Sequence, residues 1–201
     1  MELTYGRYLK VEELLQLQQP LSEGPEHDEM LFIIIHQVYE LWFKQILHEL
    51  EKLKSSFQEG ERGKALHTLK RIRSILKVLV SQVDVLETMT PLEFLSFRER
   101  LQSASGFQSC QFRELEFTLG LKNPKHLEHY PQGSEERNRL EKKMEEPSLW
   151  EVFLQFLSSL GHDSPKLEEG GRPSDPPDSS EDIQDLLEKI YRNHPDSALV
   201  C

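Results

Sequence analysis

Two pairs of residues with helical spacing could together bind a small polar aromatic ligand. Phe32 and His36 are four residues apart, as are Phe94 and Arg98, so each pair would share one face of a helix. His36 offers an imidazole that can accept a hydrogen bond. Arg98 offers a planar guanidinium, the side chain best suited to holding a carboxylate through two parallel hydrogen bonds. With two aromatic walls, these groups suit an amino acid whose flat side chain carries an N–H group.

Both polar residues also have an ordinary interpretation. His36 follows three isoleucines, Ile33, Ile34 and Ile35, and burying its ring costs about a few kcal/mol unless the ring finds a partner. That partner could be a group inside the fold or a ligand. Arg98 could likewise be a solvated charge or one half of a structural ion pair. The ligand interpretation requires His36 and Arg98 to converge on a single dry pocket.

Two further short motifs are candidates for the same site. Ser105 and Gly106 could bring backbone N–H groups close to a ligand, because glycine adopts dihedral angles that other residues avoid. Tyr5 and Tyr8 lie close to the N-terminus and would ordinarily anchor a terminal segment.

Helical periodicity dominates the elements that must position these residues. Apolar residues recur every three or four positions over residues 25–57 and again over 66–86, and Gly60 and Gly63 lie between the two runs. This pattern predicts two long antiparallel helices joined by a short link. Thr90, Pro91 and Glu93 then form a capping-box signature, which predicts a new helix that ends by 104–106.

The rest of the chain also favours an all-α fold. We expect a helix over 107–119, one opened by Pro147 and Ser148 that runs through Leu157, and a last one over 183–191. We divide the chain into a helical core (1–160), a loop rich in Pro, Gly and acidic residues (161–182), and a terminal helix with the chain end (183–201). The final residues are still apolar, which indicates either fraying or a missing downstream portion.

Composition excludes several classes of protein. Acidic residues outnumber basic ones by 35 to 24, which argues against a nucleic-acid or anionic-membrane surface. No apolar run approaches the roughly 20 residues of a membrane span, and the N-terminus lacks a signal-peptide core. Cys110 and Cys201 provide neither a disulfide framework nor metal-ligand spacing, so we expect a cytoplasmic protein. His126 and His129 lack companions at zinc-site spacing.

Four motifs carry a resemblance to a known family. They are LTYGRYL (3–9), HDEMLFIIIHQVYELWFKQ (27–45), LETMTPLEF (86–94) and SASGFQSCQFR (103–113). With them the chain resembles the haem-dependent tryptophan 2,3-dioxygenases. The resemblance implies an all-α homotetramer that binds haem b and uses dioxygen to open the indole ring of L-tryptophan, giving N-formyl-L-kynurenine.

The resemblance also implies a role for each candidate residue. His36 would be the catalytic residue that accepts the indole N–H hydrogen bond, and Arg98 would pair with the substrate carboxylate. Ser105 and Gly106 would line the haem edge. The remaining candidates would contact the substrate, with the two tyrosines entering a neighbouring subunit's pocket: Phe32, Ile33, Ile34, Ile35, Phe94, Tyr5 and Tyr8.

The chain departs from the family pattern in one important respect. The family's axial haem histidine and its Gly-Thr-Gly-Gly-Ser-Ser-Gly loop belong to a C-terminal region, and no histidine here matches the axial ligand's motif. We therefore expect the distal half of a haem pocket without its proximal half, and no metal ligand in this chain. The alternative is a non-catalytic helical protein that only assembles with other chains. A smaller departure is Ser103, which stands where the family usually has proline.

Overall fold

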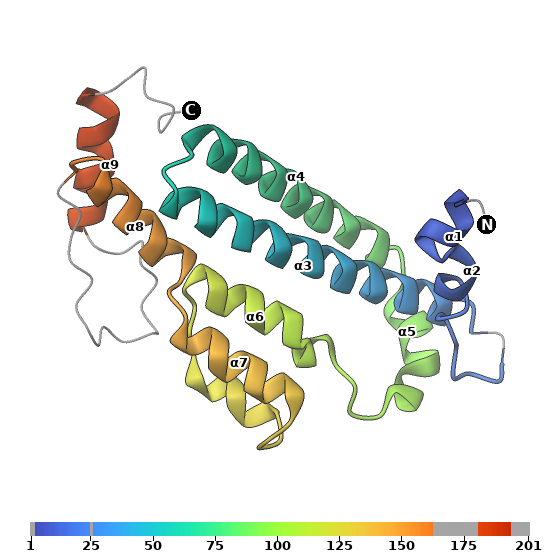
Figure 1. The fold of residues 1–201 in the computed structure, drawn as a ribbon. Coiled ribbons are helices and arrows are strands. Elements are labelled where there is room, and N and C mark those ends of the chain that lie inside the picture. Colours follow the sequence, from blue (N-terminus) through green and yellow to red (C-terminus); the bar gives the residue numbers. More distant parts are fainter. Residues whose placement is uncertain (1–2, 25, 163–180, 194–201) are drawn as a thin grey trace.

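A computed structural model describes residues 3–24, 26–162 and 181–193 (Figure 1). Within these ranges every regular element is a helix, which confirms the predicted all-α class. The α-helices and 3-10 turns are, in chain order, α1 (Tyr5–Leu9), α2 (Val11–Leu14), α3 (Asp28–Gln58), α4 (Arg62–Leu86), α5 (Pro91–Arg98), η1 (Glu99–Leu101), η2 (Gly106–Gln108), α6 (Cys110–Leu119), η3 (Pro124–His129), α7 (Glu135–Glu145), α8 (Leu149–Ser159) and α9 (Glu181–Asn193).

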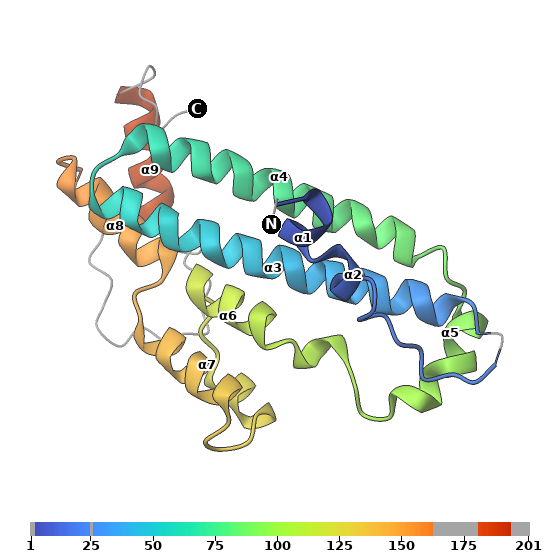
Figure 2. The same cartoon turned by 45° about the vertical axis from the view of Figure 1, so that its right-hand side comes forward.

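The predicted helical hairpin is the centre of the fold. α3 and α4 run side by side in opposite directions, joined by a tight link at Gly60, whose φ of +71° suits glycine (Figures 1 and 2). The Tyr39 hydroxyl donates to the Leu79 carbonyl across the pair at 2.8 Å. Between the helices lies a buried apolar core, which explains why two amphipathic helices adopt this pairing. Its members from these helices are Ile46, Leu50, Leu53, Phe57, Ala65, Ile72, Ile75 and Leu79.

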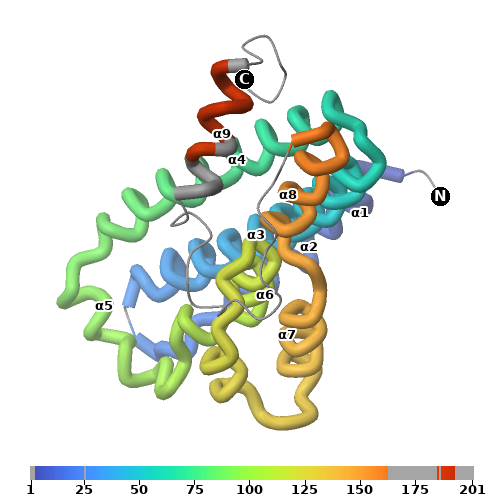
Figure 3. The backbone as a smooth tube through the Cα atoms, turned by 90° about the vertical axis from the view of Figure 1, so that its left-hand side faces the viewer, coloured from blue at the N-terminus to red at the C-terminus, as the bar shows by residue number. Residues whose placement is uncertain are grey.

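α6 and α8 pack against α3, and α7 packs against α6 (Figure 1). α8 begins where predicted, because Ser148 and Glu151 form a reciprocal capping box. The Lys54 ammonium of α3 donates to the Pro147 carbonyl at 2.7 Å, so the start of α8 is tied to the hairpin. α8 and α9 lie at the end of the molecule that faces the viewer in Figure 3. Ile190 of α9 packs there against Leu154 and Leu157 of α8.

Several element boundaries differ from those predicted. α5 ends at Arg98 and is followed by η1, so this helix has ended before 104–106, as predicted. The helix expected over 107–119 is divided, because the Ser109 hydroxyl accepts from the Phe112 N–H and starts α6 afresh. α7 was not predicted, because its sequence is charged and Leu140 is its only buried residue. α9 contains the predicted 183–191 helix, whereas most of the predicted 161–182 loop and the chain end lie outside the described residues.

The N-terminal segment is fastened to α3 by side chains of that helix. Figure 2 shows this segment beside α3. The Gln37 amide donates to the Leu17 carbonyl at 3.0 Å, and the Gln18 amide donates to the Gln37 side chain at 2.6 Å. The buried Glu29 carboxylate accepts the N–H groups of Leu21 at 2.7 Å and of Ser22 at 3.0 Å. Burial alone would raise the pKa of Glu29, but these hydrogen bonds and the nearby Arg100 charge outweigh it, so the pKa is lowered.

We expect Glu29→Gln to lower the free energy of unfolding by about 1.5–3 kcal/mol, since a buried charged acceptor is lost. Because the folded-state pKa of Glu29 is lowered, its carboxylate contributes full stability above the ordinary Glu pKa of about 4.3. That contribution disappears as the pH falls through the lower folded-state value. Urea denaturation of both proteins across the acid range measures the difference.

The matched control is Glu23→Gln, which alters an exposed carboxylate in the same segment. This control should change stability by less than about 0.5 kcal/mol. If Glu29→Gln and Glu23→Gln lowered the free energy of unfolding equally at neutral pH, the role given to Glu29 would be contradicted.

None of the helices described here is both long and apolar enough to cross a membrane.

Candidate functional site

The Phe32 and His36 side chains stack on one face of α3. Their ring centroids are 4.1 Å apart, and His36 Nδ1 lies 2.7 Å from the Phe32 carbonyl oxygen. A carbonyl oxygen can only accept a hydrogen bond, so this contact places the imidazole proton on Nδ1. Nε2 of the neutral ring therefore keeps a lone pair and is available as an acceptor.

An aromatic cluster holds α5 against the N-terminal half of α3. Phe97 is fully buried at its centre, with ring centroids 5.6 Å from Phe32 and 5.5 Å from Phe94. Phe32 and Phe94 are themselves 5.8 Å apart. α5 starts where predicted, with Thr90 and Glu93 forming the capping box. The structure thus brings together three of the predicted site residues, Phe32, His36 and Phe94.

Gly106 lies directly beside the free nitrogen of His36. A Cβ atom built on Gly106 would lie 3.9 Å from His36 Nε2, within ordinary van der Waals contact. The absence of that atom leaves Nε2 uncovered on this side. Ser105 caps η2, because its hydroxyl accepts from the Phe107 N–H at 3.3 Å while its own N–H donates to the Gln108 side chain at 3.2 Å.

Two long-range contacts hold Gly106 in place. The hydroxyl of the buried Tyr130 donates to the Gln108 carbonyl at 3.2 Å. The Gln111 amide of α6 donates to the Glu40 carboxylate at 2.7 Å and to the Glu40 carbonyl at 3.0 Å, one turn along α3 from His36. Gly106 is therefore held opposite the imidazole by contacts of η2, which contains it, and of α6, which follows it.

Arg98 is half-buried on α5, on the same face as Phe94. Its Nη1 donates to the Gln102 carbonyl at 3.0 Å. Among the residues that the structure describes, no carboxylate forms an ion pair with Arg98. The partner that the guanidinium has there is a neutral group, the Gln102 carbonyl.

The three isoleucines before His36 point in different directions, since successive residues on an α-helix are turned by about 100°. Ile34 lies on the side of α3 opposite the face that Phe32 and His36 share, and is 42 % exposed. Ile35 is buried and Ile33 is half-buried. We therefore leave Ile34 out of the site proposed below.

Tyr5 and Tyr8 lie on α1, on the surface of the N-terminal segment. They are 78 % and 72 % exposed, and neither belongs to the aromatic cluster around Phe97. Within this chain the structure does not bring them to His36 or Arg98.

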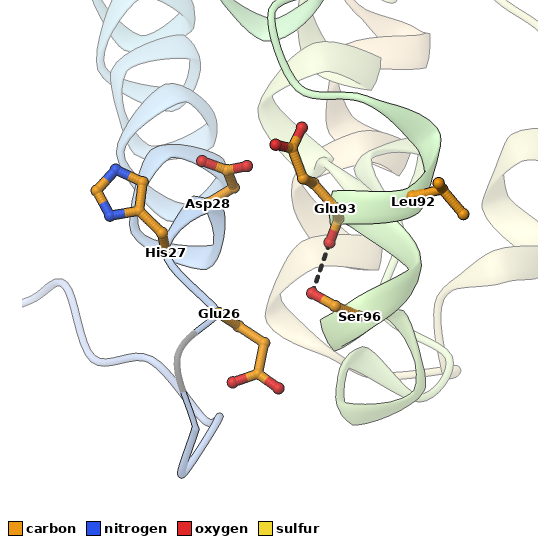
Figure 4. A pocket seen from close by; sticks show the side chains of 6 residues that line it. All are labelled: Glu26, His27, Asp28, Leu92, Glu93 and Ser96. Carbon is orange, nitrogen blue, oxygen red and sulfur yellow. Dashed lines mark hydrogen bonds between the residues drawn. The ribbon is translucent and has the colours of Figure 1, made fainter.

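A cavity of about 410 Å³ lies on the opposite face of α5 from Phe94 and Arg98, between the first turns of α3 and α5 (Figure 4). Its lining includes the carboxylates of Glu26, Asp28 and Glu93. A hydrogen bond from the backbone of Thr90 lowers the pKa of Glu93, which keeps that group ionised. An amino acid carboxylate would be repelled here, so this cavity is distinct from the site around His36.

Sequence reasoning missed the residues that assemble the site. They are Phe97, Gln102, Gln111 and Tyr130. Phe97 could have been predicted, because it lies three residues from Phe94 in a short apolar helix. Gln111 and Tyr130 act through contacts over 71 and 22 residues that no local spacing reveals, whereas Gln102 lies four residues after its partner Arg98.

Comparison with known proteins identifies the family. A family model described as Tryptophan 2,3-dioxygenase matches residues 1–173. The chain belongs to this family. Membership makes it an oxidoreductase by resemblance and confirms the family assigned from the four sequence motifs.

Three bacterial relatives, each named tryptophan 2,3-dioxygenase, show how far the similarity extends. The Herpetosiphon aurantiacus protein is 51% identical, over 99% of this chain and 76% of its own length. The protein of Anaeromyxobacter sp. (strain K) is 50% identical, over 99% of this chain and 74% of its own length. The Xanthomonas oryzae pv. oryzae protein is 42% identical, over 95% of this chain and 64% of its own length.

The residues around His36 fit the distal side of a haem group. An uncovered imidazole nitrogen stands beside a glycine and an aromatic wall, so a flat apolar macrocycle could approach without meeting a side chain at residue 106. No second histidine takes part in the described contacts of Phe32, His36 and Gly106.

Proposed function

We propose that this chain provides the substrate pocket for the oxidative opening of the indole ring of L-tryptophan to N-formyl-L-kynurenine. The observation that carries the proposal is the free acceptor of His36, held beside Gly106 and against the Phe32 ring. The half-buried cation Arg98, which has no carboxylate partner among the described residues, lies on the helix that Phe97 packs against Phe32. These groups match the functional groups of tryptophan.

His36 accepts the indole N–H through Nε2 in this proposal. The Nδ1 contact with the Phe32 carbonyl fixes both the tautomer and the ring orientation, so the acceptor is in place before the ligand binds. Phe32 forms one wall of the indole pocket, and Ile33 and Ile35 are its remaining apolar candidates on α3. Haem b, when bound, supplies the activation of dioxygen, with Ser105 and Gly106 at its edge.

Arg98 binds the substrate carboxylate in this proposal, with Phe94 beside it. A carboxylate that accepts two N–H groups from a guanidinium is held in one orientation, which fixes the amino acid end of the ligand. Together with the His36 hydrogen bond, this gives two polar contacts at opposite ends of tryptophan. Two such contacts orient the indole ring relative to the cofactor.

We further propose a cytoplasmic homotetramer in which Tyr5 and Tyr8 reach a neighbouring subunit's pocket. Support comes from the exposure of both tyrosines on α1, which leaves their rings accessible to another chain. The tyrosines would close the pocket in trans.

The direct test uses the purified full chain supplied with haem b, L-tryptophan and isotopically labelled dioxygen. We expect N-formyl-L-kynurenine that carries both labelled oxygen atoms, detected by mass spectrometry, and tryptophan binding by equilibrium dialysis. A chain that assembles but binds neither haem nor tryptophan would reject the proposal. That result would favour the non-catalytic assembly protein instead.

The Gly106→Ala variant tests whether His36 Nε2 accepts the indole N–H, and it should not disturb the fold. The added methyl group would fit 3.9 Å from His36 Nε2 but would cover the approach to it. We expect unchanged stability and an affinity for tryptophan that is lower by about threefold to tenfold, the value of one hydrogen bond. Equilibrium dialysis and thermal unfolding measure the two quantities.

The matched control is Gly63→Ala in α4, where an added Cβ meets nothing within 4 Å. It should leave tryptophan binding unchanged. If Gly106→Ala binds tryptophan as well as this control does, then Nε2 is not the acceptor of the indole N–H.

A further inference from the structure

The turn that follows η1 has an unusual backbone. The Ala104 N–H donates to the Leu101 carbonyl at 2.8 Å, which closes a tight turn over residues 101–104. Gln102, its first central residue, has φ +50° and ψ −120°. These angles are those of the first central position of a type II′ turn, where glycine is favoured. An L-residue with a Cβ atom is strained there.

Only one other non-glycine residue in the described part of the chain has a positive φ. Lys10 has φ 52° and ψ 47°, which lies in the left-handed helical well that ordinary residues can enter. Gln102 lies outside that well. Its conformation therefore needs a separate explanation.

The side chain of Gln102 does not provide one. It is exposed, and its amide forms no hydrogen bond with any residue that the structure describes. The backbone groups, in contrast, are both used. The N–H donates to the Glu99 carbonyl at 3.2 Å, and the carbonyl accepts from Arg98 Nη1 at 3.0 Å. What the strained conformation achieves is the direction of that carbonyl.

We propose that Gln102 is a positioning residue for substrate binding, whose strained backbone aims its carbonyl at Arg98 and so orients the guanidinium toward the tryptophan carboxylate. This inference rests on the function proposed above. An arginine already held by one N–H loses less conformational freedom when it binds a carboxylate, so affinity is higher than with a freely rotating side chain. Gln102 itself does not touch the substrate.

The test changes the backbone preference at position 102 in the haem-supplied full chain. Gln102→Pro forces a negative φ and should weaken tryptophan binding about threefold to tenfold, the value of ordering one side chain. Gln102→Gly permits the positive φ and should bind tryptophan as the parent chain does, with higher stability. In kinetics the proline variant should raise KM and leave kcat unchanged.

A double-mutant cycle with Arg98→Ala separates positioning from a general structural effect. In the Arg98→Ala background, Gln102→Pro should have no further effect on tryptophan affinity. The inference would be overturned if Gln102→Pro lowered tryptophan affinity equally in the parent chain and in Arg98→Ala. It would also be overturned if the glycine variant bound tryptophan as weakly as the proline variant. If the proline variant does not fold, Gln102→Val replaces it, because valine keeps the N–H but disfavours a positive φ.

The outcomes for the two proposals are distinguishable. Unchanged binding in Arg98→Ala alone would remove Arg98 from the proposed function. Weakened binding in Arg98→Ala, with every Gln102 variant equal to the parent, would overturn only the inference about Gln102.

Discussion

Replacing Phe97 with alanine is expected to lower the free energy of unfolding by about 3–5 kcal/mol. Phe97 is fully buried, and its ring contacts Phe32 of α3 and Phe94 of α5. Alanine would remove the ring at the centre of the cluster that attaches α5 to the hairpin and would leave a cavity between the helices. Because the cluster includes Phe32, the stacked partner of His36, tryptophan binding should weaken as well.

Urea denaturation followed by helical circular dichroism measures this effect. The control is Phe107→Ala, which removes an equally large ring that is 82 % exposed. That substitution should change stability by less than about 0.5 kcal/mol. A loss below about 1 kcal/mol for Phe97→Ala would mean that α5 is held by other contacts.

Arg98→Ala should reduce tryptophan affinity by about 10- to 150-fold, because hydrogen bonds to a charged group contribute about 1.5–3 kcal/mol. The guanidinium has no carboxylate partner among the described residues, so little stability should be lost with it. Arg98→Lys keeps the charge but loses the planar donor pair, so its tryptophan affinity should lie between those of the parent chain and Arg98→Ala. Equilibrium dialysis with the haem-supplied chain gives the affinities.

Tryptamine provides a ligand control, because it lacks the carboxylate but keeps the indole N–H. The parent chain and Arg98→Ala should bind tryptamine equally. Arg73→Ala removes the same charge from an exposed position on α4 and should leave tryptophan binding unchanged. A loss of tryptamine binding equal to that of tryptophan would show that Arg98 supports the pocket and does not hold the carboxylate.

Local sequence rules predicted the fold well where the boundaries of a helix depend on residues of that helix alone. The periodicity of α3 and α4, the Thr90–Glu93 cap and the Ser148 helix start are all local signals, and each is confirmed. The pattern was less accurate about burial. Ile34 and Leu41 belong to the apolar run of α3 but are exposed, because the run is wider than the face that the neighbouring helices cover.

The site was predicted residue by residue but not as an assembly. Spacing placed Phe32 with His36 and Phe94 with Arg98, each on its own helix. Phe97 brings these helices together. Two contacts bring Gly106 to His36: Tyr130 with Gln108, which are 22 positions apart in sequence, and Gln111 with Glu40, which are 71 positions apart. Contacts over such separations depend on the whole fold, so periodicity and capping rules could not reveal them.

The separate caps of α5, η2 and α6 have a consequence for how this region can change. Thr90, Ser105 and Ser109 each start their own element, and Glu40 and Tyr130 hold η2 and α6 independently of the turn at Gln102. An insertion between residues 102 and 105 would shift the carbonyl that Arg98 uses while leaving Gly106 against the imidazole. Under the proposed function, selectivity for the amino acid end of the ligand and selectivity for its ring can therefore evolve independently.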